Sequence, residues 1–209
     1  MALNSPRLRL LLWIFLLLPA SFIVWHALAS VLAAPAVFLA GEILELWLPH
    51  LVESYSLQST TMVVGTQFGD TDGTLVRLEN ADFQVAFNQD TRLLSYSIPF
   101  FAALHFASSL DNPMERFGRG LVVLWLLMVF GLICVTLKNL MVTLGEIAFA
   151  QGGLPPAPLI ALMYQFSVLM IPPVAPLCLW AWECRDSPAM RALVGMTAAK
   201  APQDVPEQP

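Results

Sequence analysis

Four long apolar runs, separated by polar stretches, dominate the pattern of residues along the chain. A helix needs about 20 predominantly apolar residues to cross a bilayer, so each run predicts a transmembrane helix. The runs contain two charged residues, Arg9 at the start of the first and Lys138 near the end of the third. The four runs cover residues 8–32, 93–110, 120–144 and 158–182.

The first apolar run has a second interpretation, as a secretory signal peptide. Arg7 and Arg9 would form its basic start, and the Ala-Leu-Ala sequence at residues 27–29 resembles a cleavage site. However, the apolar residues continue over 10–25, slightly longer than the roughly 7–15 residues of a signal-peptide core. This length favours a retained helix, whereas cleavage would leave three membrane spans.

The polar region between the first two runs begins with a helical period. Residues 36–47 carry leucine and isoleucine on one side and two glutamates on the other. This pattern predicts an amphipathic helix that lies on the outer membrane surface, or a helical extension of the first span. Pro49 ends this segment, because proline cannot continue a helix.

The same region then changes to a period of two, which is typical of half-buried strands. Strands are predicted over residues 60–68, 74–78 and 81–87, with a turn over 69–73, where glycine and aspartate tolerate left-handed backbone. So small a sheet is not stable alone. We therefore expect it to pack on the membrane helices, on the amphipathic segment or on another protein, and an exposed edge strand offers a partner's extended peptide a place to pair.

Composition supports a membrane protein and argues against several other classes. Of the 209 residues, 57% are hydrophobic and 12% are charged, and the mean hydropathy is +0.70. An average soluble domain has about 25% charged residues, so an ordinary soluble enzyme does not fit. A disordered protein does not fit either, because disorder requires low hydrophobicity and high charge. The net charge of −5 argues against a nucleic-acid partner.

The basic residues favour one orientation of the four spans, because cytoplasmic loops carry an excess of lysine and arginine. With the N-terminus inside, seven of the ten basic residues fall on the inner side and nine of the fifteen acidic residues on the outer side. The predicted fold is an α-helical integral membrane protein with about four transmembrane helices, a small extracytoplasmic β-region and an amphipathic interfacial helix. Its parts are an N-terminal span (1–32), an outer region (33–92), a three-helix bundle (93–182) and a largely disordered cytoplasmic tail (183–209).

Polar and proline residues within the apolar runs are the candidate contacts between helices or with a partner. Lys138 lies close enough to the end of its span for the side chain to reach the membrane surface. Three prolines within five residues predict a broken or strongly bent fourth helix. Tyrosine and glutamine side chains hydrogen-bond neighbouring membrane helices. The candidate positions are Tyr96, Lys138, Tyr164, Gln165, Pro172 and Pro173.

No sequence motif indicates a cofactor, a metal site or a catalytic nucleophile. The three histidines lack the spacing of metal ligands, and no cysteine is placed beside a histidine like a nucleophile beside its base. Two alternatives to a non-catalytic accessory or scaffold protein stay open. One is a carrier centred on the fourth span, Lys138 and His105. The other is an enzyme with an outer-face site around His26, Glu42 and His50.

The order of several motifs resembles a known family. A Trp-Leu-Pro element at residues 47–49 follows the amphipathic stretch, a Tyr-x-x-Pro-aromatic motif occupies 96–100, and Tyr-Gln-Phe precedes Pro-Pro-x-x-Pro within 164–176. Over most of residues 8–182 the chain resembles the exosortase H-associated membrane proteins of Gram-negative bacteria. The resemblance implies an accessory protein of the inner membrane. Its expected partner is an exosortase, a membrane-embedded Cys/Arg/His enzyme that processes C-terminal sorting signals, or the exported substrate of that enzyme.

Overall fold

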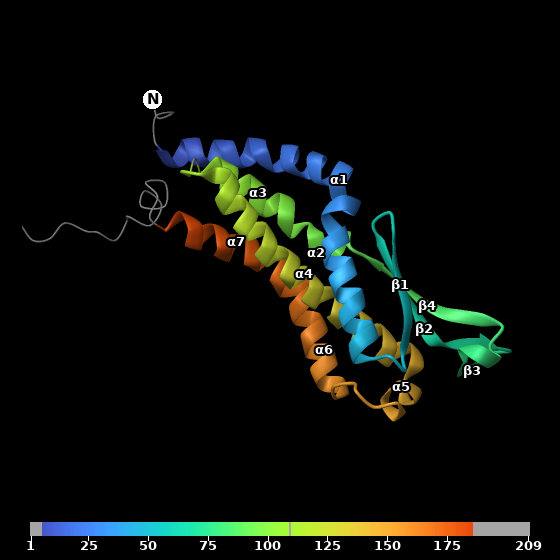
Figure 1. Cartoon of the computed structure of the whole chain (residues 1–209). Helices are drawn as coiled ribbons and strands as arrows, with labels where there is room; N and C mark the ends of the chain where they lie inside the picture. The colour runs from blue at the N-terminus through green and yellow to red at the C-terminus, as the bar shows by residue number, and fades with distance from the viewer. Residues whose placement is uncertain (1–5, 109, 186–209) are drawn as a thin grey trace, which may run out of the picture.

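Long helices lie side by side and a small sheet packs at one end of them (Figure 1). The structure, a computed structural model, describes residues 6–108 and 110–185. Within these residues, three helices are long and apolar enough to cross a membrane: Leu8–Trp47, Pro113–Leu144 and Ala157–Cys184. The prediction of a membrane protein with apolar transmembrane helices is confirmed.

The first apolar run and the amphipathic stretch form one continuous helix, α1 (Pro6–Trp47), of 42 residues. Of the two structures predicted for residues 36–47, the helical extension is therefore the one observed, and this segment is not a separate interfacial helix. α1 bends about half-way along (Figure 1), as expected for a helix in which Pro35 lacks the N–H that would bond the Val31 carbonyl. Its buried face carries small side chains that allow close helix packing: Ala29, Ala33, Ala36 and Ala40.

Residues 52–90 form a four-stranded antiparallel sheet with β2 at its centre. β4 pairs along one side of β2, while β1 and β3 follow each other along the other side. The predicted small sheet is confirmed, although it contains one strand, β1, that the alternation did not predict. A short 3₁₀ turn, η1, separates β3 from β4. The bounds are β1 (Val52–Gln58), β2 (Thr61–Thr71), β3 (Thr74–Arg77), η1 (Leu78–Asn80) and β4 (Phe83–Asp90).

The turn between β2 and β3 is shorter than predicted. β2 continues to Thr71, so the connection consists of Asp72 and Gly73, with φ of 52° and 79°. Two consecutive residues with positive φ are typical of the Asp-Gly hairpin turn whose twist matches the flanking strands. The Gly73 N–H also donates to the Asp70 carboxylate over 2.7 Å.

The second apolar run forms two short helices, α2 (Arg92–Ser95) and α3 (Ser97–Ala107), and not one long helix. At 1.5 Å per residue, the 11 residues of α3 rise about 16 Å, roughly half of the 30 Å hydrocarbon core. α3 nevertheless returns the chain from the sheet to the opposite end of the bundle (Figure 1). We call that opposite end the distal end. It is where α3 ends at Ala107, α4 begins at Pro113 and α7 ends at Cys184.

The fourth apolar run is bent but not broken. α6 is followed directly by a π-helical turn, η2, and then by α7, so the backbone stays helical throughout, and Figure 1 shows the change of direction between α6 and α7. The wider turn lies just before Pro172 and Pro173, whose missing N–H groups interrupt the α-helical hydrogen-bond ladder. The remaining elements are α4 (Pro113–Leu144), α5 (Glu146–Ala150), α6 (Ala157–Gln165), η2 (Phe166–Met170) and α7 (Ile171–Cys184).

One apolar core joins the sheet to the helices. Met62 and Val64 of β2 are fully buried, in the same cluster as Leu44 of α1 and Leu140 of α4. This packing replaces the core that a sheet of this size lacks on its own. At the end of β3, Arg77 donates to the side-chain oxygen of Gln151 over 2.6 Å and to the His50 carbonyl over 3.3 Å. The sheet is thus held against the bundle at several points.

Candidate functional site

The distal end contains a buried polar cluster built around His105 of α3. Its Nδ1 lies 2.8 Å from Oε2 of Glu183 on α7, and its Nε2 lies 2.8 Å from the carbonyl oxygen of Pro113, at the start of α4. His105 is fully buried. Because a carbonyl oxygen can only accept, Nε2 carries a hydrogen and donates it.

Neighbouring polar groups extend this cluster across three helices. Arg116 of α4 donates from Nη1 to the backbone carbonyl of Glu183 over 3.0 Å. The Trp180 indole of α7 donates to Ser108 over 2.7 Å, and the Ser108 hydroxyl donates to a carbonyl within α3. Aromatic rings surround the imidazole, with centroids 5.2 to 5.8 Å away. The rings belong to Phe101, Phe106 and Phe117.

The cluster holds three helices together through paired polar groups. An ionisable residue at membrane depth is a candidate functional group, and it is paired with an opposite charge or a backbone carbonyl. Both nitrogens of His105 are engaged in this way. The Cys184 thiol is buried beside Ser108. The observed contacts tie the end of α3 to the ends of α4 and α7.

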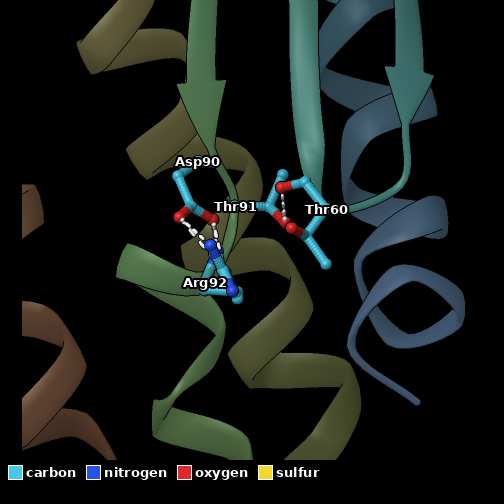
Figure 2. Close-up of polar contacts among 4 residues, drawn as sticks. All are labelled: Thr60, Asp90, Thr91 and Arg92. Atoms are coloured by element: carbon cyan, nitrogen blue, oxygen red, sulfur yellow. Dashed lines mark hydrogen bonds and ion pairs between the residues drawn. The ribbon is translucent and has the colours of Figure 1, made fainter. Parts of the chain in front are cut away.

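A second group of polar contacts shapes the corner where the sheet meets the bundle. Figure 2 shows Thr91, whose backbone N–H and hydroxyl both donate to the carbonyl of Thr60, over 2.9 and 2.8 Å. Beside it, the Asp90 carboxylate accepts from Arg92 Nε at 3.0 Å and Nη2 at 2.8 Å. These hydrogen bonds from Arg92 lower the pKa of Asp90 from its ordinary value. The corner fixes how β4 leads into α2.

The predicted contact residues of the third and fourth runs partly come together. The Lys138 ammonium lies 5.5 Å from the centroid of the Tyr164 ring and donates to the Asn139 side chain over 3.3 Å. This places Lys138 in a cation–π contact. Gln165, by contrast, lies on the exposed side of α6, and within the part of the chain that the structure describes its amide has no hydrogen-bond partner.

The other predicted positions are scattered. Pro172 is buried and Pro173 is half-buried at the start of α7. Tyr96 is half-buried between α2 and α3. In residues 6–108 and 110–185, no hydrogen bond or ring contact joins the Tyr96 side chain to Lys138 or Tyr164. Of the six predicted positions, Lys138 and Tyr164 are the two that a ring contact joins within the described residues.

Neither residue set of the two alternative functions gathers into a site. Lys138 lies 25 residues along α4 from Pro113, the partner of His105, which corresponds to about 38 Å of helix. His26 and Glu42 lie 16 residues apart on α1, about 24 Å of helix. Among the described residues, no group of three or more His, Cys, Asp or Glu side chains is placed to hold a metal ion.

The comparisons with known proteins address the membership that the motifs suggested. Residues 4–187 match the exosortase H-associated membrane protein family. The chain belongs to this family. Neither a curated protein nor a solved structure matches the chain. The predicted resemblance is confirmed, and the family description supports an accessory membrane protein associated with an exosortase.

In this exosortase H-associated membrane protein, sequence reasoning missed the pairing of His105 with Glu183. The fourth span was predicted to end at residue 182, which placed Glu183 outside the membrane. One signal was present: both residues lie within five positions of the predicted inner ends of their spans. The second and fourth spans run in the same direction, so their inner ends lie on the same side of the membrane, where these side chains can meet.

Proposed function

We propose that this chain is a non-catalytic accessory subunit that binds an exosortase-type enzyme within the bacterial inner membrane. The description of its family supports an association with an exosortase. The geometry of the distal end supports a structural role, because His105 is bonded at both nitrogens to neighbouring helices. The proposed partners are the bilayer, the enzyme and the enzyme's exported substrate.

The proposed orientation places both termini in the cytoplasm and the sheet in the periplasm. It requires α2 and α3 to act as a short fourth crossing, since the chain must return from the sheet to the distal end. Their 16 residues, Arg92–Ser95 with Ser97–Ala107 and Tyr96 between them, would rise about 24 Å as one helix. Local thinning of the bilayer accommodates a short span at modest cost. The distribution of lysine and arginine supports this orientation.

The observation that carries the proposal is the exposed amide of Gln165. It lies within an apolar surface of α6 and η2, where Leu162 is 62% exposed and Leu169 is 67% exposed. A primary amide that faces lipid without a hydrogen-bond partner is costly, by roughly 2–7 kcal/mol depending on the reference state. A polar side chain from a second membrane protein would remove this cost. The α6–η2 surface is therefore the proposed contact with the enzyme.

The sheet provides a second proposed contact, outside the membrane. It projects beyond the helices in Figure 1. Phe83, at the start of β4, is 78% exposed, and the side of β4 away from β2 is an edge, which offers backbone groups to an extended peptide. We propose that this edge faces the periplasmic part of the enzyme or the exported substrate.

Co-purification from membranes in mild detergent tests the contact through Gln165. One interhelical hydrogen bond in a membrane contributes about 1 kcal/mol, so Gln165→Leu is expected to lower the recovery of a co-expressed exosortase about fivefold. The matched control is Phe15→Leu, a substitution at an 81% exposed position of α1. We expect this control to recover the enzyme as well as the unmodified chain does.

Two results would contradict the proposal. Equal recovery with Gln165→Leu and with Phe15→Leu would remove Gln165 from the contact. Failure to cross-link the unmodified chain to any exosortase in native membranes would remove the accessory function itself. Circular dichroism of each purified variant establishes that the helices have formed before recovery is compared.

A further inference from the structure

A cavity at the distal end is lined by more positive than negative side chains. It lies between the start of α4 and the end of α7 and has a volume of about 250 Å³. Arg116, Arg119 and Arg185 line it, together with one acid, Glu183. The Glu183 carboxylate is already engaged by the imidazole of His105 at 2.8 Å. The lining therefore favours an anion.

Two of the arginines are well placed to bind that anion. Arg116 uses Nη1 to reach the Glu183 carbonyl at 3.0 Å, which holds its guanidinium at the wall of the cavity. An arginine has five N–H donors, so further donors remain available. Arg119 has a side chain that is 67% exposed, and among the described residues its ion-pair partner is Glu115, with Nη1 3.9 Å from Oε1. Planar guanidinium groups bind phosphate oxygens in pairs.

The rest of the cavity wall is apolar and lies deeper in the bundle. Val123 is one helical turn beyond Arg119 on α4, and Leu179 is one turn before Glu183 on α7. Trp182, 65% exposed, also lines the cavity, and tryptophan is typical of the membrane–water boundary. The cavity thus changes from charged at the surface to apolar towards the middle of the membrane. A free anion needs only the charged part, whereas a phospholipid uses both.

We propose that this cavity binds the phosphate head group of an anionic phospholipid, with the start of its acyl chains against the apolar wall. Basic pockets between transmembrane helices bind anionic head groups. The volume of about 250 Å³ is below the roughly 300–1,000 Å³ of pockets that enclose a drug-sized ligand, which suits a head group and not a whole lipid. The site shares no residue with the α6–η2 surface, so each proposal stands independently of the other.

Native mass spectrometry of the full chain in mild detergent tests the site. The protein is offered equal amounts of phosphatidylglycerol and phosphatidylcholine, and the bound lipids are counted. We expect phosphatidylglycerol to be retained preferentially. Each arginine near an anionic membrane surface contributes enough for Arg119→Gln to weaken phosphatidylglycerol binding about fivefold. The charge-matched control is Arg9→Gln on α1, which is outside the cavity and is expected to change binding less than about twofold.

A third variant, Val123→Phe, fills the apolar wall and leaves all three arginines in place. It is expected to weaken phosphatidylglycerol binding as well. Equal losses in Arg9→Gln and Arg119→Gln would overturn the proposal, because they would reflect the charge of the whole surface. Displacement of the lipid by millimolar inorganic phosphate would overturn the assignment to a lipid and indicate a site for free anions. No preference for phosphatidylglycerol, or unchanged binding in both Arg119→Gln and Val123→Phe, would also overturn it.

Discussion

The contact between α3 and α4 depends on the absence of a side chain at Gly120. A Cβ atom added there would overlap Cε1 and Cζ of the Phe101 ring. That ring is fully buried, and it is stacked on Phe117 with a centroid distance of 5.8 Å and an interplanar angle of 10°. Since the ring cannot move away freely, we expect Gly120→Ala to destabilise the protein. Gly118, half a turn earlier on the same helix, provides the control, because an added Cβ meets no atom within 4 Å there.

The magnitude follows from comparing the two variants. Replacing glycine by alanine within a helix stabilises it by about 1 kcal/mol, and this gain applies to both Gly118→Ala and Gly120→Ala. Overpacking a buried contact costs about 1–3 kcal/mol and applies only to Gly120→Ala. The difference between the variants therefore isolates the overpacking cost. For a chain of this size, about 2 kcal/mol corresponds to roughly 4–8 °C in the midpoint of thermal unfolding.

This difference is measured by heating each variant in the same detergent and using size-exclusion chromatography to determine how much folded protein remains at each temperature. Gly118→Ala is expected to unfold at or above the temperature of the unmodified protein. Gly120→Ala is expected to unfold about 2–4 °C below that temperature, because the gain of about 1 kcal/mol offsets part of the overpacking cost of about 2 kcal/mol. Equal unfolding temperatures for the two variants would refute the reasoning, because they would mean that Phe101 does not pack against Gly120. Adding Phe101→Leu to Gly120→Ala should restore part of the loss.

Three further predictions concern the sheet and its contacts. Thr136→Val should lower the free energy of unfolding by about 1–3 kcal/mol, because it leaves the buried Gln89 amide without its 2.7 Å hydrogen bond to Thr136. Adding Gln89→Leu should recover most of that loss in the same unfolding assay. The lowered pKa of Asp90 means that its ion pair stabilises the fold above the ordinary aspartate pKa and is lost as pH falls through the lowered value. Asp90→Asn should remove this decrease in stability at acid pH, measured as the unfolding temperature. We expect the ion pair to contribute at most about 1 kcal/mol to the free energy of unfolding, because the carboxylate is 46% exposed. The hydrogen bond to Glu42 raises the pKa of Tyr55, so the phenolate should form at higher pH by ultraviolet absorbance than in Glu42→Gln, and identical titrations would exclude this bond.

The long helices were predictable because the bilayer imposes a strict requirement on the sequence. A spanning segment must be apolar over about 20 residues, and α4 contains such a run over residues 120–144. The second run satisfied the same criterion less well and folded differently. Its helix is divided at Tyr96, where the Ser97 hydroxyl donates to the Leu94 carbonyl and competes with the backbone ladder. Hydropathy alone does not detect such local competition.

The strand β1 and the distal cluster were harder to predict for different reasons. In β1, the register shifts between Val52 and Ser54, so Val52 lies on the same face as Tyr55 and Leu57 and the period of two is interrupted. Pairing with β2 decides the structure. His105 and Glu183 are 78 positions apart, and their contact arises only when α3 packs against α7. A single sequence contains the two residues but not the packing that joins them.

The continuity of α1 determines how the sheet is presented at the membrane surface. No linker separates the membrane-embedded part of the helix from Glu42, which accepts a hydrogen bond from Tyr55 over 2.8 Å at the sheet. The length of the helix therefore sets both the height of the sheet and its rotation about the helix axis. One inserted residue near its middle would raise the sheet by about 1.5 Å and rotate it by about 100° about the helix axis. Arg77 and Gln89 also hold the sheet against the bundle, so such a rotation would break those contacts. The sheet is therefore presented to a partner at one height and in one orientation about the helix axis.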